Sequence, residues 1–280
     1  MPALEYWEEL RSGDTGQVIL AVDGLPGAEF PSGFCDLAPL LDTPHALWRA
    51  LPVTASGPSP NDEGPDGEGL KGEGLDAYVR PWIAGVVATG LRVHTVLGSR
   101  VGGIYAGVIA RALARHQDAG PELLLFDPEL IDAGSIIDEF HRVLSQLSTP
   151  LAYDELGTLE LKAATAADAA FDDVEALAAD LRGLLAGVPG VEEAELALAA
   201  RRFDALTRAE PVDVLPLWST RTALCSSSPD RGLARARSAL LLPEAGFVRE
   251  EIVFSDDHTA VFKSTQVARA ASDLLHSYGV

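Results

Sequence analysis

The sequence is poor in cysteine and in basic residues, and each shortage argues against a class of protein. Its 280 residues include two cysteines, Cys35 and Cys225, which lie far apart and fit no metal-binding spacing. A disulfide framework is therefore not expected, and a reducing cytoplasmic location fits. The 21 Lys and Arg residues face 42 Asp and Glu, which gives a net charge of -21. We expect a chain this acidic to bind neither nucleic acid nor an anionic membrane.

Long apolar runs are also missing. No stretch of about 20 uninterrupted apolar residues occurs, so no transmembrane helix is predicted. The first residues, Met1 to Glu9, are acidic and have no apolar core, so a signal peptide is not expected. Hydrophobic residues make up 47% of the chain, which is enough to bury a full core. Neither a cofactor nor a metal ion is predicted, because no motif for one occurs.

Buried strands alternate with helices in the first half of the chain. Apolar runs at residues 17–22, 93–97 and 122–127 are typical of strands that are buried on both faces. Helices are predicted at 75–89 and 102–116. This alternation predicts an α/β fold with a parallel sheet and helices on both of its faces. The remaining predicted elements are strands at 50–54, 212–218 and 247–254, and a helix at 267–278.

Residues 132–209 have a different character, because they are rich in alanine and show helical periodicity without a strong strand. The best helix candidates there are residues 167–185 and 191–206. Since strands resume afterwards, we expect a helical lid at 132–209, inserted into a core formed by residues 1–131 and 210–280. A separate helical domain is the alternative.

The segment from Leu91 to Ala110 carries the most informative pattern, a buried strand followed by a sharp turn and a helix that begins at two glycines. Residues 98–102 read Gly-Ser-Arg-Val-Gly, which follows the G-x-S-x-G spacing of a nucleophile elbow. Arg100 stands where the nucleophile is expected. A guanidinium stays protonated at every relevant pH, so Arg100 is neither a nucleophile nor a base. Ordinary serine acyl transfer at this position is therefore excluded.

Three segments in order resemble the thioesterase family of the α/β-hydrolase fold, nearest to the thioesterases of polyketide and nonribosomal peptide pathways. They are the elbow with its following helix at 96–113, the strand end at 123–127 and the segment 255–262. The resemblance implies a mostly parallel central sheet, with Asp127 as the triad acid and His258 as the base. It also implies an oxyanion hole formed by backbone N–H groups of Val101 and of the loop that contains Gly27.

Arg100 leaves three functions open. In the first, an acyl or polyketide intermediate binds, and His258 assists a non-covalent cyclisation, elimination or hydrolysis while Arg100 holds an anionic or carbonyl-bearing group. In the second, the protein is an inactive thioesterase homologue that binds an acyl chain or docks to an acyl carrier protein. In the third, it is an editing thioesterase that uses Ser99, one residue before the expected nucleophile, or Cys225. The sequence ranks the first slightly above the second, and the third last.

Overall fold

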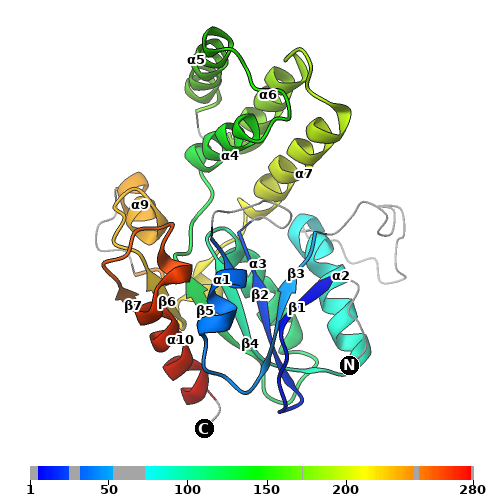
Figure 1. Cartoon of the computed structure of the whole chain (residues 1–280), viewed down its shortest axis with the longest axis vertical. Helices are drawn as coiled ribbons and strands as arrows, with labels where there is room; N and C mark the ends of the chain where they lie inside the picture. The colour runs from blue at the N-terminus through cyan, green and yellow to red at the C-terminus, as the bar shows by residue number, and fades with distance from the viewer. Residues whose placement is uncertain (1–5, 25–31, 53–72, 172, 242–245, 279–280) are drawn as a thin grey trace. The chain divides into compact units, whose positions relative to one another are not determined.

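The structure is a computed structural model that describes the whole chain except residues 1–5, 25–31, 53–72, 172, 242–245 and 279–280 (Figure 1). It divides into two compact units, which are residues 1–129 with 213–280, and residues 130–212. Within the described part of the chain, no helix is both long and apolar enough to cross a membrane.

The first unit is built on a sheet whose described strands follow the order β1-β3-β2-β4-β5-β6-β7. β1 pairs antiparallel with β3, and the other neighbouring pairs are parallel. The predicted parallel sheet is therefore confirmed. The strands are β1 (Trp7–Arg11), β2 (Gln17–Val22), β3 (Ala46–Ala50), β4 (Arg92–Ser99), β5 (Glu122–Phe126), β6 (Thr222–Cys225) and β7 (Glu250–Val253).

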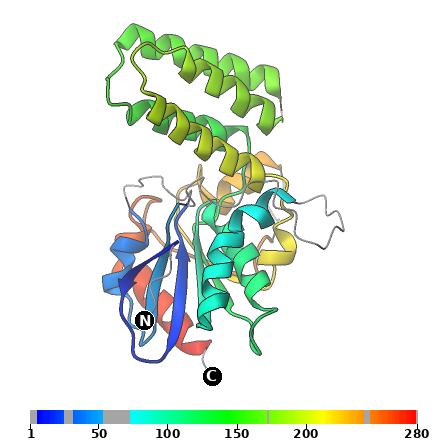
Figure 2. The same cartoon turned by 90° about the vertical axis from the view of Figure 1, so that its right-hand side faces the viewer.

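Helices cover both faces of this sheet, which explains why its central strands are largely apolar. On one face, α1 (Phe34–Leu37), the 3-10 helices η1 (Ala38–Leu40) and η2 (Val261–Lys263), and α10 (Thr265–Ser277) share a buried core with the strands. On the other face, α3 (Gly102–Leu113) packs on β4 and β5, and α2 (Glu73–Thr89) packs on α3. Figure 2 shows α10, in red, and α2, in cyan, on opposite sides of the sheet. The unit also contains α8 (Leu215–Trp218) and α9 (Gly232–Ala239).

Two predicted strands are not found where they were expected. The strand predicted at 50–54 overlaps β3 only at Ala50, residues 51–52 form no strand, and 53–54 lie outside the described residues. The second is the apolar run at 212–218, whose last four residues form the short helix α8, and the penultimate strand, β6, follows at Thr222–Cys225. Pro216 lies in the first turn of α8, where the missing N–H costs nothing, and the Asp213 carboxylate accepts a hydrogen bond from the N–H of Leu215. Leu217 and Trp218 are buried from this helix, and Nε1 of Trp218 donates to the carbonyl of Gly103.

The second unit is helical in its described residues, and it contains the region predicted to be inserted. Its helices are α4 (Ala133–Ser145), α5 (Tyr153–Ala170), α6 (Val174–Ala186) and α7 (Glu193–Ala209). The single helix predicted at 167–185 is therefore two helices. Glu139 is buried and pairs with both Arg142 and Arg202, and its burial raises the pKa of its carboxyl group. The role of this unit as a lid stays a prediction.

Candidate functional site

Arg100 lies at a strained turn between β4 and α3. Its φ is +51°, in the left-handed region that non-glycine residues rarely occupy. The turn requires small neighbours. A Cβ on Gly98 would lie 2.7 Å from the Cβ of Ala106, and one on Gly102 would lie 2.5 Å from the carbonyl oxygen of Val22. The backbone therefore has the strand–turn–helix form of a nucleophile elbow, with an arginine at its tip.

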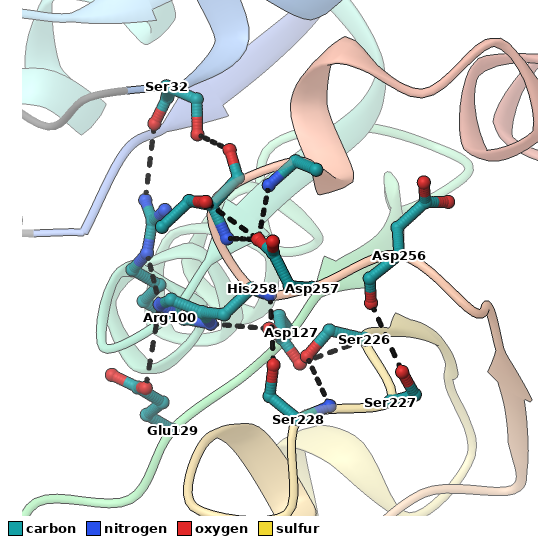
Figure 3. Close-up of polar contacts among 12 residues, drawn as sticks. Ser32, Arg100, Asp127, Glu129, Ser226, Ser227, Ser228, Asp256, Asp257 and His258 are labelled. Atoms are coloured by element: carbon teal, nitrogen blue, oxygen red, sulfur yellow. Dashed lines mark hydrogen bonds and ion pairs between the residues drawn. The ribbon is translucent and has the colours of Figure 1, made fainter.

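Asp127 and His258 come together, although 131 positions separate them in the sequence. Asp127 directly follows β5 and is 2% exposed, and its Oδ2 lies 2.5 Å from Nδ1 of His258. The loop after β6 holds both residues (Figure 3). The Ser226 N–H donates to Oδ1 of Asp127 at 3.1 Å, and the His258 N–H donates to Oγ of Ser228 at 3.0 Å. These contacts fix the acid and the imidazole in one orientation.

The Arg100 side chain turns toward this pair. Its Nε lies 2.9 Å from Nε2 of His258 (Figure 3). A guanidinium nitrogen can only donate, so Nε2 is the acceptor and carries no proton. The His258 proton is then on Nδ1, where it is donated to Asp127. His258 is thus neutral in this arrangement, and the lone pair that a general base uses is occupied by Arg100.

The surroundings of Arg100 are largely closed to solvent, and the residue is 4% exposed. Its Nη1 lies 3.4 Å from the carbonyl oxygen of Ser32, and its guanidinium carbon lies 5.4 Å from the ring centroid of Phe262. Two further carboxylates are close. Oε1 of Glu129 lies 3.9 Å from Nε2 of His258. Burial raises the pKa of Asp23, while the positive charges of Arg49 and Arg100 oppose this rise.

The remaining predicted residues are placed less favourably for chemistry. Ser99 is fully buried, and its Oγ accepts a hydrogen bond from the Gly24 N–H at 3.1 Å. This contact ties the end of β2 to the elbow and favours a structural role for Ser99. Val101 is the N-cap residue of α3. Gly27 lies outside the described residues, so the two-donor oxyanion hole stays a prediction.

Sequence reasoning missed three groups that complete the site, namely Ser32, Glu129 and the serines at 226–228. Glu129 lies two positions after Asp127, and the run of three serines follows a buried strand, so both signals were visible in the sequence. Ser32 has no local signal, because its contact with Arg100 spans 68 positions.

Among the described residues, no group of three or more His, Cys, Asp or Glu side chains could hold a metal ion.

Comparison with protein-family models and with curated protein sequences gave no match. Solved structures do match. The Vlm2 thioesterase domain, bound with a dodecadepsipeptide, is 17% identical over 97% of this chain and 98% of its own, with a TM-score of 0.52. A lipase-esterase related protein from Clostridium acetobutylicum is 11% identical over 99% and 100%, with a TM-score of 0.50. The chain has the α/β-hydrolase fold.

A third match is to a four-domain nonribosomal peptide synthetase bound to AMP and glycine. It is 12% identical over the whole of this chain and 20% of that one, with a TM-score of 0.52. At such identities the likeness establishes the α/β-hydrolase fold and not an activity. Within this fold, Arg100 after β4, Asp127 after β5 and His258 after β7 follow the chain order of a nucleophile, acid and base.

Proposed function

We propose that this chain is a thioesterase-like protein of polyketide or nonribosomal peptide biosynthesis that binds an acyl or peptidyl intermediate without forming an acyl-enzyme. One observation carries the proposal, which is the hydrogen bond from Nε of Arg100 to Nε2 of His258. It puts a permanently protonated donor where the hydroxyl of a nucleophile would lie. The elbow therefore offers no nucleophilic atom to which an acyl group can be transferred.

The same hydrogen bond favours a binding protein over a base-assisted enzyme, which reverses the order that the sequence alone suggested. A general base must present its lone pair to the proton that it removes. The lone pair of His258 faces Arg100, whose proton it cannot take at any relevant pH. The Asp127–His258 pair then serves to orient the guanidinium.

A base-assisted cyclisation, elimination or hydrolysis is the second candidate, and the retained contact between Asp127 and His258 supports it. For this chemistry, the Arg100 side chain must leave Nε2 of His258 when the ligand binds. The third reading, hydrolysis through Ser99, has less support, because the Ser99 hydroxyl is buried and already accepts a hydrogen bond. Delivery of the intermediate by an acyl carrier protein is part of the proposal.

The experiment is a comparison of binding and turnover in the purified protein. We expect acyl-pantetheine amides, which cannot be cleaved as thioesters, to bind with an affinity that rises with chain length. We expect the matched thioesters to be hydrolysed no faster than in buffer, by the wild type and by His258→Gln alike. Turnover that is lost in His258→Gln would establish the base-assisted candidate instead. Absence of binding at every chain length would overturn the proposal.

A further inference from the structure

The charges at the site point to the kind of ligand group that it can accept. Two carboxylates, those of Asp127 and Glu129, lie beside His258, which accepts a hydrogen bond from Arg100 (Figure 3). Asp127 accepts from His258 on one side, and Glu129 lies 3.9 Å from the His258 atom that accepts from Arg100. With His258 neutral, these residues carry a formal charge of -1, from two carboxylates and one guanidinium.

Arg100 is therefore a poor receptor for an anionic ligand. Its Nε donates to His258, its Nη1 points to the carbonyl of Ser32, and its guanidinium lies over the ring of Phe262. The neighbouring carboxylates offset its charge. The net charge of -21 on the whole chain adds a negative field that repels anions at longer range. An added carboxylate or phosphate would meet more repulsion than attraction here.

Glu129 has the opposite property, because it offers an acceptor. Its side chain is 14% exposed, and its Oε1 is shielded from solvent. Across the part of the chain that the structure describes, no residue donates a hydrogen bond to this oxygen. A shielded carboxylate oxygen is stabilised by a donor, and most strongly by a charged one.

We propose that the bound intermediate carries a protonated amine and that Glu129 receives it. This inference rests on the proposed function, since it names the chemical class of the intermediate in the same site. An ammonium group brings three N–H donors and one positive charge. It would neutralise the formal charge of the site and pair with Oε1 of Glu129. The ligand class is therefore an aminoacyl or peptidyl chain with a free amino group.

A matched ligand series tests this inference by calorimetry. The probes are the hexanoyl, 6-aminohexanoyl and 5-carboxypentanoyl amides of aminopantetheine, which differ only in their terminal group and cannot turn over as thioesters. For the wild type, we expect the amino ligand to bind about tenfold more tightly than the hexanoyl ligand, and the carboxy ligand to bind most weakly. Added salt should reduce the difference between the amino and carboxy ligands.

The decisive variant is Glu129→Gln, which keeps the size of the side chain and removes its charge. We expect it to lose most of the tenfold preference for the amino ligand over the hexanoyl ligand. Glu9→Gln is the matched control, since Glu9 is an exposed residue of the edge strand β1 and the change in total charge is the same. The control should keep the preference.

The outcomes separate the inference from the proposed function. If the wild type binds the amino and hexanoyl ligands equally, or if Glu129→Gln keeps the preference, the inference is overturned and the proposed function stands. If none of the three ligands binds to the wild type, the proposed function fails and the inference fails with it.

Discussion

The Nε of Arg100 lies 2.9 Å from Nε2 of His258, and Nδ1 of the same ring lies 2.5 Å from Oδ2 of Asp127. The hydrogen bonds therefore run in one direction, from arginine to histidine to aspartate. A serine triad has the same direction, from hydroxyl to imidazole to carboxylate. Arg100 donates a hydrogen bond to His258, as the hydroxyl of a triad nucleophile does. Because its guanidinium cannot give up its proton, the three residues keep the hydrogen-bond order of a triad but cannot carry out nucleophilic catalysis.

Asp127→Asn should destabilise the first unit strongly. The buried carboxylate accepts from both His258 and the Ser226 N–H. We expect the free energy of unfolding in urea to fall by about 2–4 kcal/mol. Asp230→Asn is the matched control, because Asp230 is exposed and lies on the neighbouring loop. Its effect should stay within about 0.5 kcal/mol, and equal effects of the two changes would contradict the assigned role of Asp127.

Ser99→Ala should affect stability and leave reactivity unchanged. The Ser99 hydroxyl accepts from the Gly24 N–H inside the protein, so its loss leaves a buried donor without a partner. We expect a destabilisation of about 1–2 kcal/mol, measured by urea unfolding. A fluorophosphonate probe should label neither the wild type nor this variant. Labelling of the wild type that disappears in Ser99→Ala would instead support hydrolysis through Ser99.

The stacked rings of His45 and His94 should make stability fall on mild acidification. The ring centroids are 4.3 Å apart. The pKa of His94 is lowered to about 4, first by burial and then by the charges of His45 and Arg92. Burial and His276 also lower the pKa of His45, while Asp14 opposes this. The unfolded chain therefore takes up protons first as the pH falls through about 6.5.

The stability contributed by this pair is present above that pH and decreases toward pH 4. Because both rings are partly exposed, solvent screening limits the expected loss between pH 7.5 and 5 to about 1 kcal/mol. The measurement is urea unfolding at both pH values. His94→Gln should reduce the loss, and an unchanged pH dependence in this variant would assign the effect to other groups.

The sequence predicted the central strands well, because parallel strands with helices on both faces are near-continuous apolar runs. The runs at 17–22, 93–97 and 122–127 correspond to β2, β4 and β5. β1 was not predicted, since this edge strand pairs on one side and carries exposed charged residues. The run at 212–218 was misassigned because a short apolar stretch does not distinguish a strand from a helix.

For the site, motif order located Arg100, Asp127 and His258, since each follows a predictable strand. The sequence could not show which hydrogen bonds join their side chains. The contact between Arg100 and His258 spans 158 positions, and its direction depends on a side-chain orientation that no local pattern determines. The contribution of Ser32, which lies before α1, is likewise a product of tertiary packing.

The most direct test of the account restores the missing nucleophile. Arg100→Ser places a hydroxyl at the elbow, where Nε2 of His258 becomes free to accept its proton. We predict that a fluorophosphonate probe labels Arg100→Ser, and that the label is lost in the double variant Arg100→Ser/His258→Gln. The wild type and Arg100→Ala should remain unlabelled. A folded Arg100→Ser protein that resists labelling, or labelling that persists without His258, would contradict the claim that Arg100 occupies the nucleophile position of an otherwise assembled triad.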